Sequence, residues 1–151
     1  MTSNLQEMTD RKTWLGILAK AAPAQLDALL VQFGTLPDHD VLRQPEIGGA
    51  MVRGRIGAVG QAFNLGEMTV TRCSVKLTEG AVGHGYVQGR DKTHAHQAAL
   101  VDAMMQTGQA ALLRRVVLGP LEAEAQARKT TRAAKAAATK VDFFTMVRGE
   151  N

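Results

Sequence analysis

The stretch Glu67–Gln88, EMTVTRCSVKLTEGAVGHGYVQ, decides the fold class of this chain. In residues 67–77 and 82–88, valine, threonine and other strand-forming residues alternate with polar ones, which is typical of half-buried strands. A short connection through Thr78, Glu79 and Gly80 joins the two segments, whereas parallel strands need a crossover of about a dozen residues or more. The sequence therefore predicts an antiparallel hairpin.

Two helices are expected before the strands. Thr9 or Asp10 can cap the first helix, whose apolar residues follow helical spacing from Trp14 onward. Pro23 suits the first turn of the second helix, and Gly34 suits its end.

Glycine-punctuated runs rich in valine, threonine and arginine predict two further strands, near residues 41–46 and 50–56. After the hairpin, the apolar spacing predicts a long helix over 91–113 and a last helix over 120–139. The expected fold is α+β, an antiparallel sheet of about four strands flanked by the N-terminal helices and two C-terminal helices.

The length of 151 residues, with 45% hydrophobic and 21% charged content, fits one globular domain. We expect a single domain over 1–151, with helices in 1–36, strands in 37–89, helices in 90–140 and an apolar docking tail in 141–151.

The tail reads VDFFTMVRGEN and is apolar where most chains become polar and frayed. Burial of each large apolar side chain is worth about 1.5–3 kcal/mol, so exposure of the tail to water would be costly. The tail is expected to fold back or to dock on a partner. The interface residues predicted there are Phe143, Phe144, Met146 and Arg148.

No run of about 18 apolar residues occurs, and the N-terminus carries no apolar run with a cleavage pattern. Neither secretion nor membrane insertion is indicated, and a cytoplasmic location is expected. The one cysteine, Cys73, excludes an internal disulfide and a cysteine-rich zinc site. Its place in an alternating run favours a half-buried strand residue over a nucleophile.

The densest polar cluster, GHGYVQGRDKTHAH, spans residues 83–96. Arg90, Lys92 and His94 crowd the N-terminal turn of the predicted helix over 91–113, where cations are unfavourable unless an anion compensates them. An anion, phosphate or carboxylate site is one interpretation. In the other, Asp91 caps the helix while Arg90 and Lys92 point into water.

A metal site at His94 and His96 is not expected. Residues two apart on a helix point about 200° from each other, whereas helical zinc ligands are spaced i and i+4. Both histidines could face one ion only if the segment were extended. With neither cysteine nor an acidic cluster nearby, we predict no metal.

Basic residues occur on two predicted surfaces. Because side chains two residues apart in a strand point to the same side, Arg53 and Arg55 share one side of their strand, and Arg72 and Lys76 share one side of theirs. One interpretation is a cationic sheet face, and the other is ordinary solvated strand polarity. The net charge is +4 and the isoelectric point about 9.6. The segment QARKTTRAAKAAATK carries five basic residues and no acid, namely Arg128, Lys129, Arg132, Lys135 and Lys140.

Nucleic-acid binding is nevertheless not expected of this basic segment. Glu122 and Glu124 precede the basic residues, as an isolated surface helix prefers for its dipole. Aromatic content is only 4%, which is poor for a base-stacking platform. A basic surface helix is the favoured interpretation.

Several motifs together resemble the PhnG subunit family of the bacterial carbon–phosphorus lyase system. They are VQGRDKTHA at 87–95, the terminal VDFFTMVRG at 141–149, GRIG at 54–57, TVTR at 69–72 and VKLTEG at 75–80. The resemblance covers essentially the whole chain and includes the N-terminal helix with Trp14. Where this chain has His84 and Gly85, the family carries a tyrosine and a serine, so no role is assigned to His84.

The resemblance implies a subunit of a complex with PhnH, PhnI and PhnJ, with which an ATPase-like subunit associates. In that complex a phosphonate displaces adenine from C1 of the ribose of ATP, giving an α-D-ribose 1-alkylphosphonate 5-triphosphate. The family places this catalysis on PhnI. Carbon–phosphorus bond cleavage belongs to PhnJ, which holds the iron–sulfur cluster and uses S-adenosylmethionine, so no cofactor is expected on this chain.

The residues agree with this division of labour, because the sequence contains no P-loop and no credible nucleophile or metal constellation. No catalytic residue is predicted. Arg90, Asp91, Lys92 and His94 are the candidates for an anion site or for an interface with acidic partner residues. A generic interaction module and a small basic nucleic-acid binder remain the alternative functions.

Overall fold

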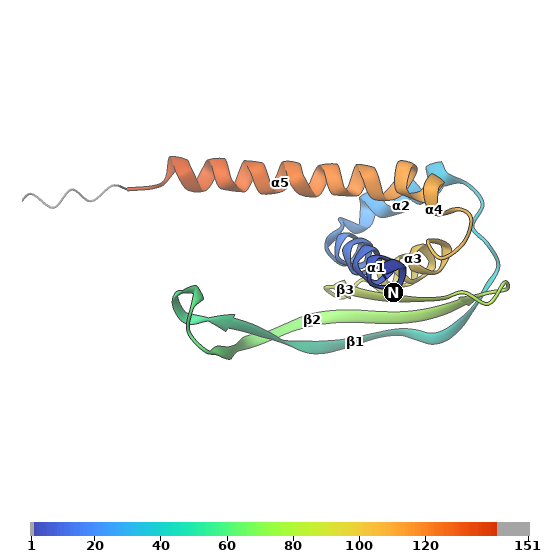
Figure 1. Cartoon of the computed structure of the whole chain (residues 1–151), viewed down its shortest axis with the longest axis horizontal. Coiled ribbons are helices and arrows are strands. Elements are labelled where there is room, and N and C mark those ends of the chain that lie inside the picture. The colour runs from blue at the N-terminus through green and yellow to red at the C-terminus, as the bar shows by residue number, and fades with distance from the viewer. Residues whose placement is uncertain (1, 142–151) are drawn as a thin grey trace, which may run out of the picture.

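The computed structural model describes residues 2–141 and places helices on one face of an antiparallel sheet (Figure 1). The elements, in chain order, are α1 (Thr2–Lys20), α2 (Pro23–Phe33), β1 (His39–Arg55), η1 (Ile56–Ala58), β2 (Ala62–Leu77), β3 (Val82–Gln88), α3 (Lys92–Met104), α4 (Ala110–Leu113), η2 (Arg114–Leu118) and α5 (Gly119–Ala138). The α+β class and the β2–β3 hairpin are as predicted.

The described sheet has three strands in the order β1-β2-β3, so the prediction of about four strands is wrong. The segments predicted as two strands, 41–46 and 50–56, belong to the single strand β1. Gly48 and Gly49 do not end a strand, because they pair in register with Val70 and Thr69 of β2. The side chain of Glu67 occupies the space that a Cβ at Gly49 would need. Glycine at this position therefore makes room for the Glu67 side chain and does not mark a turn.

The β1–β2 hairpin extends well beyond β3. Strand β3 pairs with β2 only from Val70 to Lys76, whereas β1 pairs with β2 as far as Ala62. We call the two-stranded part beyond β3, residues 49–69, the hairpin arm. It reverses at η1, where Gly57 and Ala58 both have positive φ angles. Figure 1 shows the arm projecting past α1, α2 and α3.

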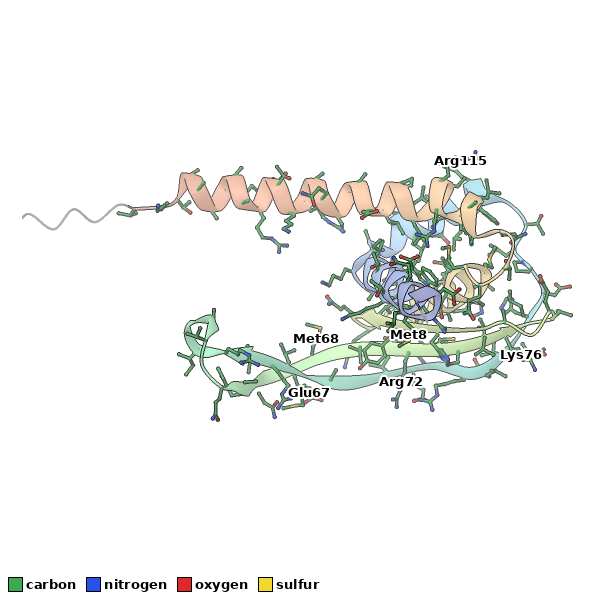
Figure 2. The ribbon with its side chains drawn as sticks, viewed as in Figure 1. Met8, Glu67, Met68, Arg72, Lys76 and Arg115 are labelled. Carbon is green, nitrogen blue, oxygen red and sulfur yellow. The ribbon has the colours of Figure 1, made fainter. Side chains whose placement is uncertain are left out.

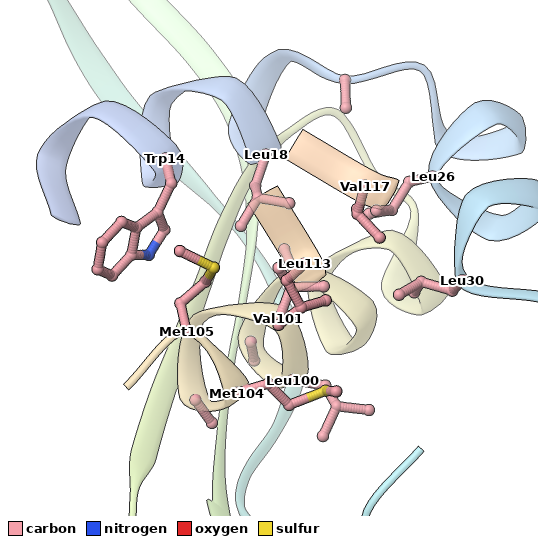
Figure 3. Close-up of a cluster of buried hydrophobic side chains, with 14 of the residues drawn as sticks. Trp14, Leu18, Leu26, Leu30, Leu100, Val101, Met104, Met105, Leu113 and Val117 are labelled. Carbon is pink, nitrogen blue, oxygen red and sulfur yellow. The ribbon is translucent and has the colours of Figure 1, made fainter. Parts of the chain in front are cut away.

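The core lies between the sheet and the helices (Figure 3). Cys73, Val75 and Leu77 face it from β2, and α3 packs over them with every residue from Ala98 to Met104 buried. Strand β3 approaches α3 so closely that a Cβ at Gly83 or Gly85 would collide with the helix backbone. The core therefore extends from the sheet through α3 to α1, α2 and the start of the last helix.

The C-terminal helices differ from the prediction. The expected helix over 91–113 ends at Met104, and the chain turns through residues 105–109 before helical backbone resumes at Ala110. That backbone continues to Ala138 with one wider, π-helical turn at η2. The widening has a physical reason, because Pro120 has no N–H and its ring would clash with a carbonyl four residues earlier in a regular α-helix.

Helix α5 projects from the domain in the same direction as the hairpin arm (Figure 1). Leu121 is buried, but from Gln126 onward every residue of α5 is exposed. Among the described helices, no single one is long and apolar enough to cross a membrane; α1 and α2 meet the length and composition criterion only together, with a bend of 116° between them.

Candidate functional site

The QGRDKTH turn leads from β3 into α3, and the structure fixes its backbone with local hydrogen bonds. Gly89 has φ of 96°, a left-handed conformation that favours glycine, and its N–H donates to Thr69 O at 2.9 Å. The Thr71 hydroxyl donates to Gly89 O at 2.7 Å. Asp91 then caps α3, because its carboxylate accepts from His94 N at 2.9 Å. The turn is thus firmly attached to β2.

The four predicted residues of this turn do not share one surface. Arg90 and Lys92 are exposed, whereas His94 is only 2% exposed. The imidazole Nε2 of His94 bonds Leu18 O of α1 at 2.8 Å. Anion binding here stays a prediction, and the geometry assigns Asp91 and His94 to holding α3 in place.

Asp102 was not among the predicted site residues. Its carboxylate is fully buried and accepts four hydrogen bonds, two of them from Arg11 at 2.7 and 3.1 Å. The others come from Trp14 Nε1 and His84 N, both at 2.8 Å. These donors belong to α1 and β3, so Asp102 joins both elements to α3. Its charge is compensated by the ion pair with Arg11.

The other three histidines also have polar partners. His39 and His96 approach each other with 2.9 Å between their Nε2 atoms, and the Ser74 hydroxyl lies 2.8 Å from His84 Nδ1. Burial, and secondarily the charge of His39, lower the pKa of His96 below its ordinary value. The Ser74–His84 pair lies on the exposed face of the sheet.

Cys73 is buried, as its alternating sequence context predicts. Burial raises the pKa of the thiol, although a hydrogen bond from the Ser74 backbone acts in the opposite direction. The thiolate form that would act as a nucleophile is therefore disfavoured. Across residues 2–141, no cluster of three or more histidine, cysteine or acidic side chains could hold a metal ion.

The exposed sheet face carries acids beside its bases. Arg72 pairs in register with Glu46, and their side chains form an ion pair at 3.3 Å. Lys76 pairs in register with Asp40. Because Arg72 and Lys76 each have an acidic neighbour, this part of the sheet fits an ordinary solvated polar face better than a cationic face that binds anions.

Among the described residues, the hairpin arm carries the largest concentration of exposed apolar side chains. Ile56 and Val59 at its tip are 76% and 92% exposed. The other large apolar residues exposed along the arm are Met51, Phe63, Leu65 and Met68. Figure 2 places Met68 on the side that faces α5 and Glu67 on the opposite side. Clustered exposed apolar residues mark interaction surfaces, so the arm is the strongest candidate functional site.

Comparison with known proteins agrees with the motifs. The family model described as "Phosphonate metabolism protein PhnG" matches residues 9–149. The chain belongs to the PhnG family. A relative from Rhizobium meliloti (strain 1021) is 39% identical over 150 residues, covering 99% of this chain and 96% of that protein. That relative is named alpha-D-ribose 1-methylphosphonate 5-triphosphate synthase subunit PhnG.

The PhnG match includes the hairpin arm, the QGRDKTH turn and α5 within its boundaries. It also includes the predicted tail interface, but Phe143, Phe144, Met146 and Arg148 lie outside the described residues. For this member of the PhnG family, the structure adds the hairpin arm as a candidate interface that the sequence patterns did not predict. A sequence signal for this surface exists, because Met51, Phe63 and Leu65 are large apolar residues in a region whose glycines predict short strands and turns.

Proposed function

We propose that this PhnG-family chain is a non-catalytic subunit of an α-D-ribose 1-methylphosphonate 5-triphosphate synthase complex in phosphonate catabolism. The reaction of the complex is displacement of adenine from ATP by a phosphonate. The relative from Rhizobium meliloti is named as a subunit of this synthase and is similar along nearly the whole chain, which supports the assignment. The partners proposed are PhnH, PhnI and PhnJ, with an ATPase-like subunit associating in the cytoplasm.

The observation that carries a subunit role is the hairpin arm. A two-stranded hairpin is at best marginally stable in water without a further strand or helix on its apolar face. Here the arm exposes apolar side chains from Met51 to Met68 and extends beyond α1, α2 and α3, in the same direction as α5 (Figures 1 and 2). Burying this surface against another subunit would stabilise the arm and the complex together.

Helix α5 offers a second, chemically different contact. Its exposed part carries Arg128, Lys129, Arg132 and Lys135, and Arg128 is paired with Glu124 of the same helix at 3.6 Å. A basic helix of this kind complements an acidic partner surface and adds specificity more than affinity. We propose the same docking role for the tail over 141–151, following its apolar sequence.

The chemistry of the described residues supports a non-catalytic role. The buried polar groups Asp102, His94 and Thr71 all form hydrogen bonds that hold elements of the fold together. Cys73 is a buried thiol with a raised pKa. We therefore propose that the reacting groups, and the cofactors of the reaction, belong to partner subunits.

Assembly and adenine release test this proposal together. The full-length chain is co-expressed with PhnH, PhnI and PhnJ, the complex is purified, and adenine release from ATP and methylphosphonate is measured after the ATPase-like subunit is added. The arm variant carries Val59→Asp and Leu65→Asp. The matched control is Val31→Asp, because Val31 is an exposed apolar residue on α2 rather than on the arm.

The proposal predicts that wild type and Val31→Asp assemble and release adenine, whereas the arm variant fails in both. Complete assembly by the arm variant would refute the role of the arm. Adenine release by the three partners without this chain would refute the subunit function. A chain truncated after Lys140 tests the tail in the same assay.

A further inference from the structure

His39 and His96 come together although 57 residues separate them in sequence. His39 is the first residue of β1, and His96 lies in the second turn of α3. Their Nε2 atoms are 2.9 Å apart, and the ring centroids are 5.0 Å apart with an interplanar angle of 41°. Both side chains are partly buried. The fold thus brings the same nitrogen of two imidazoles within hydrogen-bond distance of each other.

The proton on His39 is placed by its second contact. Its Nδ1 lies 3.0 Å from Pro37 O, and a carbonyl oxygen only accepts hydrogen bonds. Nδ1 of a neutral His39 therefore carries the hydrogen, which leaves a lone pair on Nε2. A backbone carbonyl that fixes the far nitrogen in this way is the usual second contact of a metal-binding histidine.

His96 is also suited to the neutral state. Burial, and secondarily the nearby His39, lower the pKa of its imidazole below the ordinary value, which is the direction that favours the unprotonated ring. Neutral imidazole is the form that coordinates metal ions.

We propose that His39 and His96 form a two-histidine site for a divalent transition-metal ion that favours imidazole, such as Zn²⁺. Tetrahedral Zn²⁺ with Zn–N bonds of about 2.0–2.1 Å holds two nitrogens about 3.3–3.4 Å apart, so the rings need to separate by only about half an ångström. The hydrogen on His96 Nε2 moves to its Nδ1, so neither ring changes its charge. Water completes the coordination, since the described part of the chain supplies no third protein ligand.

This site differs from the His94–His96 metal site that the sequence argues against, because here His96 pairs with His39. His94 bonds Leu18 O and is almost fully buried, whereas His39 approaches from the segment that follows α2. A bound ion would link the start of β1 to α3. Metal binding is therefore expected to raise the melting temperature of the chain as well as to be measurable directly.

Calorimetric titration with ZnCl₂ tests the site. The full-length chain is first freed of metal with a chelator, and wild type is compared with His39→Gln and His96→Gln. His84→Gln is the control, because it also removes one partly accessible histidine but leaves the pair intact. We expect wild type and the control to bind one Zn²⁺ and each site variant to bind at least about tenfold more weakly, since even supporting contacts contribute ten- to hundredfold.

Equal affinity of all four proteins, or the absence of a one-to-one site in wild type, would overturn the proposal. Circular dichroism establishes that the variants fold. If a variant does not fold, the imidazole NMR signals of wild type decide: on addition of Zn²⁺, those of His39 and His96 shift while those of His84 and His94 do not. Shifts at neither member of the pair would exclude the site.

Discussion

Trp14 Nε1 donates a hydrogen bond to Asp102 Oδ1 over 2.8 Å, which joins α1 to α3 across 88 residues of sequence. Arg11 binds the same carboxylate from one turn earlier in α1, and the backbone N–H of His84 binds it from β3. One buried side chain therefore fixes the N-terminal helix against both the sheet and the helix that covers it.

Asp102→Ala should destabilise the folded chain strongly. The substitution leaves Trp14 Nε1 and His84 N without an acceptor and removes the partner of Arg11, and loss of one member of a buried ion pair typically costs about 3–5 kcal/mol. Chemical denaturation measures the change. Asp10→Ala is the control, because its contact with Arg114 is a solvent-exposed pair at 3.8 Å and should contribute less than about 1 kcal/mol. Similar losses in both variants would contradict the role given to Asp102.

Gly85→Ala should also destabilise the chain, by about 1–3 kcal/mol or more, because the added methyl group would meet the backbone of α3 at Ala95 and Ala99. Gly16→Ala should have the opposite effect. Gly16 lies in α1 with open space around it, so alanine is expected to stabilise the helix by about 0.5–1 kcal/mol. Thermal unfolding of both variants tests the pair, and a tolerated Gly85→Ala would show that β3 and α3 can separate without cost.

Cys73 should not react with a thiol reagent while the chain is folded. Burial excludes the reagent and raises the pKa of the thiol, so little thiolate is present near neutral pH. A colorimetric disulfide reagent should detect no thiol in the native chain and one thiol after denaturation. Rapid reaction of the native protein would mean that β2 opens readily from α3.

The arm substitutions Val59→Asp and Leu65→Asp should leave the stability of the isolated chain within about 0.5 kcal/mol of wild type. Both side chains are exposed, and surface substitutions away from packed features usually have small effects. Thermal unfolding checks this expectation. A large loss of stability would mean that the arm contributes to folding, so failure of the variant to assemble could no longer be assigned to a lost contact.

The sequence predicted those parts of the fold that depend on local periodicity. The α+β class and the β2–β3 hairpin follow from alternation and short connections, and the cap formed by Asp91 was one of the two interpretations of its turn. The predicted number of strands is wrong because the glycine pattern places a break between two strands at Gly48 and Gly49. The sequence does not distinguish a glycine inside a strand from a glycine in a turn, whereas the structure shows both glycines paired with β2 and the side chain of Glu67 packed against Gly49.

Long-range contacts could not be predicted in the same way. Asp102 lies in a helix with apolar neighbours, and nothing in its local sequence identifies Trp14 or Arg11 as partners. The proximity of His39 and His96 likewise depends on how β1 starts beneath α3. The exposure of Phe63 and Leu65 is a property of an arm that extends past its own core, and apolar content alone would have suggested burial.

The arm has a consequence for how this chain can change during evolution. At about 3.4 Å per residue, the part of β2 from Ala62 to Val70 reaches about 27 Å beyond the point where β3 begins to pair. Because the large apolar side chains there are exposed, substitutions of them are expected to have little effect on the folding of this polypeptide and to act mainly on the surface that the arm contacts. Compensating mutations for a damaged Phe63 or Leu65 are therefore expected in the gene of a neighbouring protein rather than in this one.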